Sequence, residues 1–246
     1  MSISNLYEQL PQKYRKDLAT YANYDKLQIS LPNRFSIIAP SGFGKTNLTL
    51  NLIMLMNCFT KIYIIAKHFD SEPLYEWFID SLHEMEERLS KKHRQPVKIL
   101  ELVSSDLADL PDADEFDADE TNLVIFDDLV TETNKAKLKN MCDLWIRGRK
   151  RNVSCMYLSQ NYFDIPKTMR KNTGILILKD LGTERDKRAI LSEVAKDKDM
   201  SQMQAMMKAS EPEKLECFFM IDTSCGAKKE LRYRHNFTAF PEDFGK

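Results

Sequence analysis

An apolar run that leads directly into a glycine-rich loop constrains this chain more than any other feature of its sequence. Residues 35–38 are the apolar run, residues 39–46 read Ala-Pro-Ser-Gly-Phe-Gly-Lys-Thr, and a helical pattern follows from Asn47 to Met56. A short strand, such a loop and a helix N-terminus together direct backbone N–H groups at one point, where an anion can bind. The order therefore predicts a phosphate-binding loop between a strand and a helix.

Each position of this loop has an expected part in binding a nucleoside triphosphate. Lys45 is expected to reach the β- and γ-phosphates, and the Thr46 hydroxyl is expected to hold Mg²⁺. The first glycine of the usual G-x-x-x-x-G-K-[ST] pattern is replaced by Ala39, which fits if its φ angle is negative. The full set of predicted nucleotide-binding residues is Ala39, Pro40, Ser41, Gly42, Phe43, Gly44, Lys45, Thr46 and Asn47.

Apolar runs alternate with helical patterns along the chain, which predicts βαβ units and a mostly parallel sheet. Strands are expected at residues 34–39, 61–66, 97–102, 122–127, 153–158, 174–178 and 217–222, with residues 231–234 pairing with the last. Helices are expected at residues 47–56, 72–92, 135–145 and 184–208, and the acidic residues 106–120 are expected to form a solvated loop with little helix. The predicted fold class is α/β. We divide it into an N-terminal lead-in (1–30), one domain (31–235) and a C-terminal tail (236–246).

Composition excludes several classes of protein. The formal net charge is −1, so the overall charge argues neither for nor against a nucleic-acid partner. The five cysteines form no C-x-x-C pair, which favours a reducing, intracellular setting; Cys155 and Cys217 lie in apolar runs and are expected to be buried. The opening residues lack the apolar segment of a signal peptide, and no apolar stretch is long enough to span a membrane.

Polar side chains end two of the predicted strands, at the sheet edge where ligands bind in such folds. Asp127 is expected to help hold Mg²⁺ opposite Thr46, and Asp128 is expected to polarise the attacking water. Gln160 ends the next strand, where its amide could contact the γ-phosphate or that water. The alternatives are a carboxylate pair that caps a helix and a glutamine exposed in a turn.

A basic segment, residues 147–151, precedes the strand that ends near Gln160. Arg147 and Arg149 could supply positive charge to the γ-phosphate on a neighbouring subunit. They could equally contact a nucleic-acid backbone or lie on a solvated surface. These three interpretations stay open from the residues alone.

This order of motifs resembles the viral genome-packaging ATPases, which belong to the FtsK–HerA class of P-loop NTPases. The resemblance rests on the Gly-Lys-Thr loop, the strand ending in Asp-Asp, and residues 148–154 (Gly-Arg-Lys-Arg-Asn-Val-Ser) running into Leu-Ser-Gln at 158–160. It covers about residues 34–180 and is nearest in character to the virophage members. The family typically has Gly-Arg-His where this chain has Lys150 in place of the histidine, which leaves Arg149 as the better candidate and Arg147 as the second.

The resemblance implies a RecA-like central sheet flanked by helices and a Mg²⁺-dependent ATPase. It also implies a homo-oligomeric ring of five or six subunits, with nucleotide sites between subunits, that moves double-stranded DNA into a preformed capsid. DNA would be held by its backbone without sequence readout. The expected location is inside an infected cell, in a viral factory or on the virion, with a capsid vertex protein as a further partner.

Two other functions stay open at this stage. A small P-loop nucleotide kinase would also carry a basic segment, although the Asp-Asp strand and Gln160 fit it less well. An assembly switch that binds nucleotide without translocating DNA is consistent with Asp128 standing where many ATPases have glutamate. The aromatic tail at 236–246 is expected to pack on the domain, with docking on a neighbouring subunit or capsid vertex as the alternative.

Overall fold

The computed structural model describes residues 21–179, 183–195, 197–210, 216–224 and 228–245. Residues 1–20 of the predicted lead-in, and Cys225, lie outside these ranges. Within the described part of the lead-in, Tyr21, Leu27 and Ile29 are buried in the core. The short helix α2 (Tyr24–Leu27) lies in this stretch.

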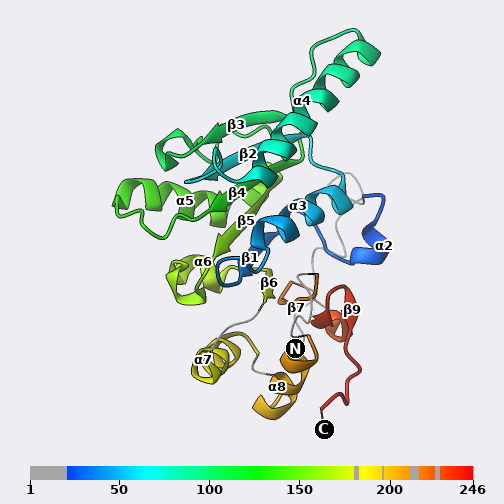
Figure 1. Ribbon diagram of the computed structural model, residues 1–246, viewed down its shortest axis with the longest axis vertical. Helices are drawn as coiled ribbons and strands as arrows, with labels where there is room; N and C mark the ends of the chain where they lie inside the picture. The colour runs from blue at the N-terminus through cyan, green and yellow to red at the C-terminus, as the bar shows by residue number, and fades with distance from the viewer. Residues whose placement is uncertain (1–20, 180–182, 196, 211–215, 225–227, 246) are drawn as a thin grey trace, which may run out of the picture.

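A nine-stranded sheet with the order β3-β2-β4-β5-β1-β6-β7-β8-β9 forms the centre of the molecule (Figure 1). The six strands from β3 to β6 in this order are parallel to one another, and β7, β8 and β9 extend the sheet beyond β6 by antiparallel pairing. This confirms the predicted mostly parallel sheet and the pairing of the last predicted strands. The strands are β1 (Arg34–Ile38), β2 (Lys61–Ala66), β3 (Leu100–Ser104), β4 (Asn122–Asp127), β5 (Val153–Ser159), β6 (Ile175–Leu178), β7 (Phe219–Asp222), β8 (Tyr233–His235) and β9 (Thr238–Ala239).

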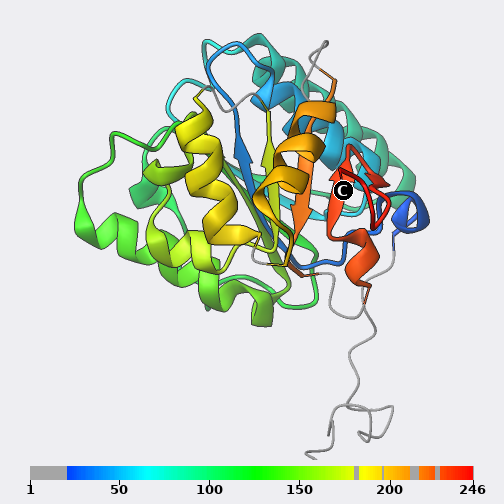
Figure 2. The ribbon, with the colours of Figure 1, turned by 90° about the horizontal axis from the view of Figure 1, so that it is seen from below.

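The central strands are mostly apolar because helices cover both faces of the sheet (Figure 2). Successive side chains of a strand enter different cores: in β4, Val124 and Phe126 lie in one cluster, whereas Leu123 and Ile125 lie in the other. The first cluster packs under α5 (Lys135–Arg147), α6 (Lys167–Lys171), α7 (Glu184–Val194) and α8 (Met200–Ala209); the second packs under α2, α3 (Lys45–Met56) and α4 (Pro73–His93).

Two predicted elements differ in kind from those observed, and the strand predicted at 97–102 begins three residues later, as β3. The single helix expected at 184–208 is two helices, because Asp199 accepts a hydrogen bond from the backbone N–H of Gln202 (2.8 Å) and begins α8 as its N-cap. The acidic segment 106–120 has little helix, as expected, only the 3₁₀ turn η2 (Leu107–Asp109). It is not a solvated connection, however, since every third side chain is apolar and buried: Leu107, Leu110, Ala113 and Phe116.

The remaining 3₁₀ turns are η3 (Gly148–Arg151), η4 (Tyr162–Asp164) and η5 (Lys229–Leu231). Cys155 is buried, as predicted, but the prediction for Cys217 is wrong: it is partly exposed because it precedes β7 instead of lying within it. Phe240 in the C-terminal tail lies 6.2 Å from Phe219 between ring centroids, so this part of the tail packs on the domain. Among the helices that the structure describes, none combines the length and apolar composition that crossing a membrane requires.

Candidate functional site: a phosphate-loop pocket at the strand ends

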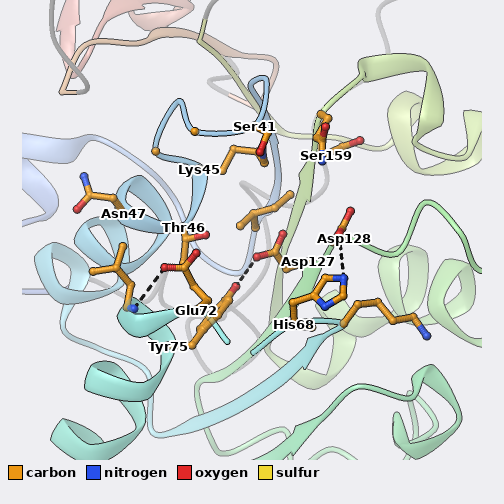
Figure 3. Close-up of a pocket in the computed structure, with 17 residues that line it drawn as sticks. Ser41, Lys45, Thr46, Asn47, His68, Glu72, Tyr75, Asp127, Asp128 and Ser159 are labelled. Carbon is orange, nitrogen blue, oxygen red and sulfur yellow. Dashed lines mark hydrogen bonds and ion pairs between the residues drawn. The ribbon is translucent and has the colours of Figure 1, made fainter. Parts of the chain in front are cut away.

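A pocket of about 570 Å³ opens at the carboxyl ends of the parallel strands, where the loop after β1 faces β4 and β5 (Figure 3). This is where an α/β sheet of this kind binds ligands, because the parallel strands all end at the same edge. The strand β5 lies between β1 and β4 in the sheet, so residues far apart in sequence meet here. The lining residues are Ser41, Gly42, Gly44, Lys45, Thr46, Asn47, Ala66, Lys67, His68, Glu72, Leu74, Tyr75, Asp127, Asp128, Leu158, Ser159 and Gln160.

The loop before α3 depends on two glycines in the left-handed region of backbone conformation. Gly42 has a φ of 80° and Gly44 a φ of 74°, and Gly44 is also the N-cap of α3. Ala39 is absent from the residues with positive φ, so alanine is tolerated at the position where the pattern has glycine. The loop therefore keeps its turn although the first glycine is replaced.

Lys45 lies at the start of α3 with its ammonium folded over the loop. Its Nζ donates to the carbonyl oxygens of Ala39 (2.9 Å) and Pro40 (3.1 Å). Burial lowers the pKa of Lys45, and the nearby carboxylates of Asp127 and Asp128 act in the opposite direction. The amine of Lys45 is thus held over the loop by two carbonyl groups and interacts electrostatically with both carboxylates.

Asp127, the last residue of β4, is a mostly buried carboxylate in this pocket. Tyr75 in the first turn of α4 donates its hydroxyl to Oδ2 of Asp127 at 2.9 Å, as Figure 3 shows. Burial raises the pKa of Asp127 to about 6, whereas the Tyr75 hydrogen bond and the charge of Lys45 lower it. Burial also raises the pKa of Tyr75 well above its usual value, so the phenol keeps its proton and remains a donor at neutral pH.

Asp128 follows the strand in the left-handed conformation, with a φ of 55°, which aspartate tolerates better than most residues. The turn directs its side chain toward His68, whose Nε2 lies 3.9 Å from Oδ2 of Asp128 (Figure 3). Gln160 lies at the end of β5 on the other side of the pocket and is exposed. A carboxylate and an amide therefore face the pocket from neighbouring strands.

The structure brings most of the predicted site residues together and separates the rest. Ala39, Pro40 and Phe43 do not line the pocket, although the first two supply the carbonyls that hold Lys45. Arg147 and Arg149 precede β5, whose seven residues span about 20 Å. Both arginines therefore lie near the amino ends of the parallel strands, whereas the pocket lies at their carboxyl ends.

The two arginines differ in their surroundings, although both are exposed. Arg147 Nη2 lies 2.8 Å from Oδ2 of Asp114, in the acidic segment. The Arg149 side chain has no ion pair within the described ranges. Of the two, Arg149 is therefore the freer to contact another molecule.

Comparison with known proteins decides the family. The poxvirus A32 protein family matches residues 20–238, which is most of the chain. The chain belongs to the poxvirus A32 family. This confirms the predicted resemblance to viral genome-packaging ATPases of the FtsK–HerA class. The more specific likeness to the virophage members stays a prediction.

Solved structures resemble this A32 family member more distantly, and no curated protein sequence matches it. The DNA-packaging ATPase B204 of Sulfolobus turreted icosahedral virus is 13% identical, covering 78% of this chain and 92% of its own, with a TM-score of 0.48. The genome-packaging NTPase B204 of Sulfolobus turreted icosahedral virus 2, in complex with ATP-gammaS, is 10% identical. The match covers 85% of this chain and 98% of that protein, also with a TM-score of 0.48. EssC (ATPases 2 and 3) of Geobacillus thermodenitrificans is 10% identical, covering 68% of this chain and 36% of its own, with a TM-score of 0.38. At such scores the assignment rests on the family match.

Eight residues that line this A32 family pocket were not predicted from the sequence, and three of them make side-chain contacts that bear on the site: His68, Glu72 and Tyr75. All three follow β2, the neighbour of β4 in the sheet, so the rule that ligands bind at the carboxyl ends of parallel strands points to them. In the sequence, these residues belong to a polar stretch that leads into a helix and matches no known motif. Glu72 caps that helix, accepting a hydrogen bond from the backbone N–H of Leu74 at 3.4 Å.

The oxygen atoms of this A32 pocket fit a magnesium ion. Thr46, at the start of α3, and Asp127, at the end of β4, both line it, and hydroxyl and carboxylate oxygens are ligands that Mg²⁺ prefers. The raised pKa of Asp127 means that its neighbours compensate its charge only in part. A cation bound there would supply the missing compensation.

Proposed function

We propose that this chain hydrolyses ATP with Mg²⁺ and uses the energy to move double-stranded viral DNA into a preformed capsid, as a homo-oligomeric ring of five or six subunits. The observation that carries the hydrolytic part is the pocket itself. It places the loop lysine, a hydroxyl, two carboxylates and an amide around one space at the strand ends: Lys45, Thr46, Asp127, Asp128 and Gln160. Membership of the A32 family supports the packaging part.

The residues divide the chemistry among them. Backbone N–H groups of the loop and the ammonium of Lys45 bind the phosphates and neutralise charge that builds on the β- and γ-oxygens. Thr46 and Asp127 would hold a magnesium ion, which would supply Lewis-acid neutralisation of charge on the phosphate oxygens. Asp128 accepts a proton from the attacking water, and Gln160 orients that water by a hydrogen bond.

The pocket of one chain lacks a group that such a reaction uses. No arginine is among the described residues that line it. An arginine that approaches the γ-phosphate from a neighbouring subunit would stabilise transition-state charge. Arg149 is the first candidate and Arg147 the second, because Asp114 already pairs with Arg147. A ring that closes each site with the next subunit would couple hydrolysis to assembly.

The DNA would be held by its phosphate backbone, since packaging has to proceed through any sequence. Contacts of that kind depend strongly on salt. A capsid vertex protein would be the further partner, and the setting would be the interior of an infected cell.

The proposed function is tested by measuring ATP turnover over a series of protein concentrations, with and without duplex DNA. We expect turnover per chain to rise steeply with protein concentration and again with DNA, and to be lost in Lys45→Ala. Turnover that ignores both concentration and DNA would contradict the motor and favour the nucleotide kinase. Nucleotide binding without turnover would favour the assembly switch.

A further inference from the structure

One tyrosine in the pocket, Tyr75, donates a hydrogen bond to the carboxylate that is proposed to hold the metal. The hydroxyl of Tyr75 donates to Oδ2 of Asp127 at 2.9 Å, and its side chain is only 1% exposed. A buried phenol usually finds a partner for its O–H, but a backbone carbonyl would serve as well. Here the partner is the one carboxylate that ends the strand opposite the phosphate loop.

The phenol reaches Asp127 from a fixed position. Tyr75 lies in the first turn of α4, where Glu72 caps the helix, and its ring is part of the core cluster between α3, α4 and the sheet. Phe78 and Leu82 on the same face of α4 are buried in that cluster. The position of the hydroxyl is therefore set by the packing of α4 on the sheet.

A positively charged alternative partner for Asp127 is close by. The charge of Lys45 lowers the pKa of Asp127. In this structure the Lys45 ammonium donates its hydrogen bonds to the carbonyl oxygens of Ala39 and Pro40. Without the phenol, the buried carboxylate would have an unsatisfied oxygen, and turning toward Lys45 would be one way to compensate it. Such a turn would remove both residues from their expected roles.

We infer that Tyr75 is a positioning residue for the nucleotide reaction: it holds Oδ2 of Asp127 and so fixes the orientation of the carboxylate that would hold the cation. The inference rests on the proposed function, because it concerns the same metal site. Hydrogen-bond partners behind a metal ligand typically affect metal affinity by 10- to 100-fold. Tyr75 therefore acts on the cation through Asp127 and does not itself contact substrate.

The test is the affinity of the ADP complex for Mn²⁺, a paramagnetic substitute for Mg²⁺, measured by electron paramagnetic resonance of the free ion. Tyr75→Phe keeps the ring and removes only the hydroxyl. We expect Mn²⁺ affinity to fall about tenfold or more, while ADP affinity in the presence of EDTA stays within about twofold. Tyr21→Phe is the matched control, because Tyr21 is also buried and donates to a backbone carbonyl, that of Ile29 (3.0 Å), outside the pocket. We expect it to leave Mn²⁺ affinity unchanged.

A second comparison keeps the inference testable if Tyr75→Phe lowers the stability of the protein. In an Asp127→Asn background, adding Tyr75→Phe should cause no further loss of Mn²⁺ affinity, because the two residues act as one unit. Independent, additive losses would overturn the inference, as would unchanged Mn²⁺ affinity in Tyr75→Phe or an equal loss of ADP affinity without metal. If the wild-type ADP complex binds no Mn²⁺, the proposed metal-dependent function itself fails.

Discussion

At the scale of single residues, burial of the Asp127 carboxyl group opposes its ionisation. Its pKa is raised to about 6 by burial, so ionising it costs free energy in the folded chain that it does not cost in the unfolded chain. A raised carboxyl pKa means that this cost appears as the pH rises from about 4 to about 6 and is complete above that range.

Asp127→Asn should therefore stabilise the metal-free protein while it abolishes metal-dependent hydrolysis. In EDTA at pH 7.5 we expect the free energy of unfolding to increase by about 1–2 kcal/mol, somewhat less than a two-unit pKa shift allows. The gain should disappear by about pH 3, where the wild-type carboxyl is mostly protonated in both states. Thermal unfolding of both proteins at the two pH values measures this. A variant that is less stable than wild type at pH 7.5 would contradict the assignment of burial as the cause.

Asp128→Asn separates catalysis from binding at the neighbouring position. The amide keeps the size of the side chain but accepts protons poorly, so we expect turnover to fall by about a hundredfold or more with nucleotide affinity nearly unchanged. Titration with a fluorescent ADP analogue and steady-state turnover give the two quantities. Loss of affinity instead would make Asp128 a metal ligand or a structural residue.

Much of the site could be predicted from single residues because a motif fixes them. Lys45, Thr46 and Asp127 belong to patterns in which spacing and chemistry coincide, and the structure places all three in one pocket. Tyr75 could not be predicted in this way. Its contact with Asp127 depends on how α4 packs against the sheet, and one tyrosine near the start of an amphipathic helix carries no such information.

At the scale of elements, the end of α5 is fixed by a buried cation. Arg34 on β1 is fully buried and donates to the carbonyls of Trp145 and Val153, the latter at 2.6 Å, so it ties the helix end to β5. Burial lowers the pKa of its guanidinium. Gly148 sits against this group: a Cβ there would lie 3.2 Å from Arg34 Nη2 and 3.2 Å from Cβ of Val153.

Gly148→Ala should therefore destabilise the fold by overpacking, by about 1–3 kcal/mol. Because Gly148 begins η3, which carries Arg149, the same change should lower DNA-stimulated turnover more than nucleotide affinity. Denaturant unfolding and the two activity measurements test this. Lys150→Ala, an exposed change on the same turn, serves as the control and should leave stability unchanged. Equal stability of Gly148→Ala and wild type would show that the helix end can move.

Elements were predictable where one type of pattern dominated. The buried parallel strands are continuous apolar runs, and the sequence placed them to within a few residues. The break between α7 and α8 was missed because a charged helical pattern continues across it, although Asp199 followed by Gln202 is a cap signal. The acidic segment was misjudged because its charges hide a buried residue at every third position, from Leu107 to Phe116.

At the scale of the whole molecule, the pocket and the basic turn η3 lie at opposite ends of the parallel strands: the pocket at the carboxyl ends and η3 at the amino end of β5. Within one chain the arginines cannot reach the phosphates. In a ring built head to tail, the η3 edge of one subunit can face the pocket of the next, so each site would be completed by two chains. The sequence alone does not give this separation, because it depends on the direction and length of β5 in the sheet.

Mixing two inactive variants is the most direct test of a site shared between subunits. Lys45→Ala removes phosphate binding and Arg149→Ala removes the arginine, so each variant alone should hydrolyse ATP at least about a hundredfold more slowly than wild type. Mixed under conditions where subunits exchange, they should regain a clear fraction of wild-type turnover, because an intact pocket meets an intact arginine at some interfaces. Mixed rings that form and stay inactive would contradict a site shared between subunits, as would an Arg149→Ala protein with wild-type turnover.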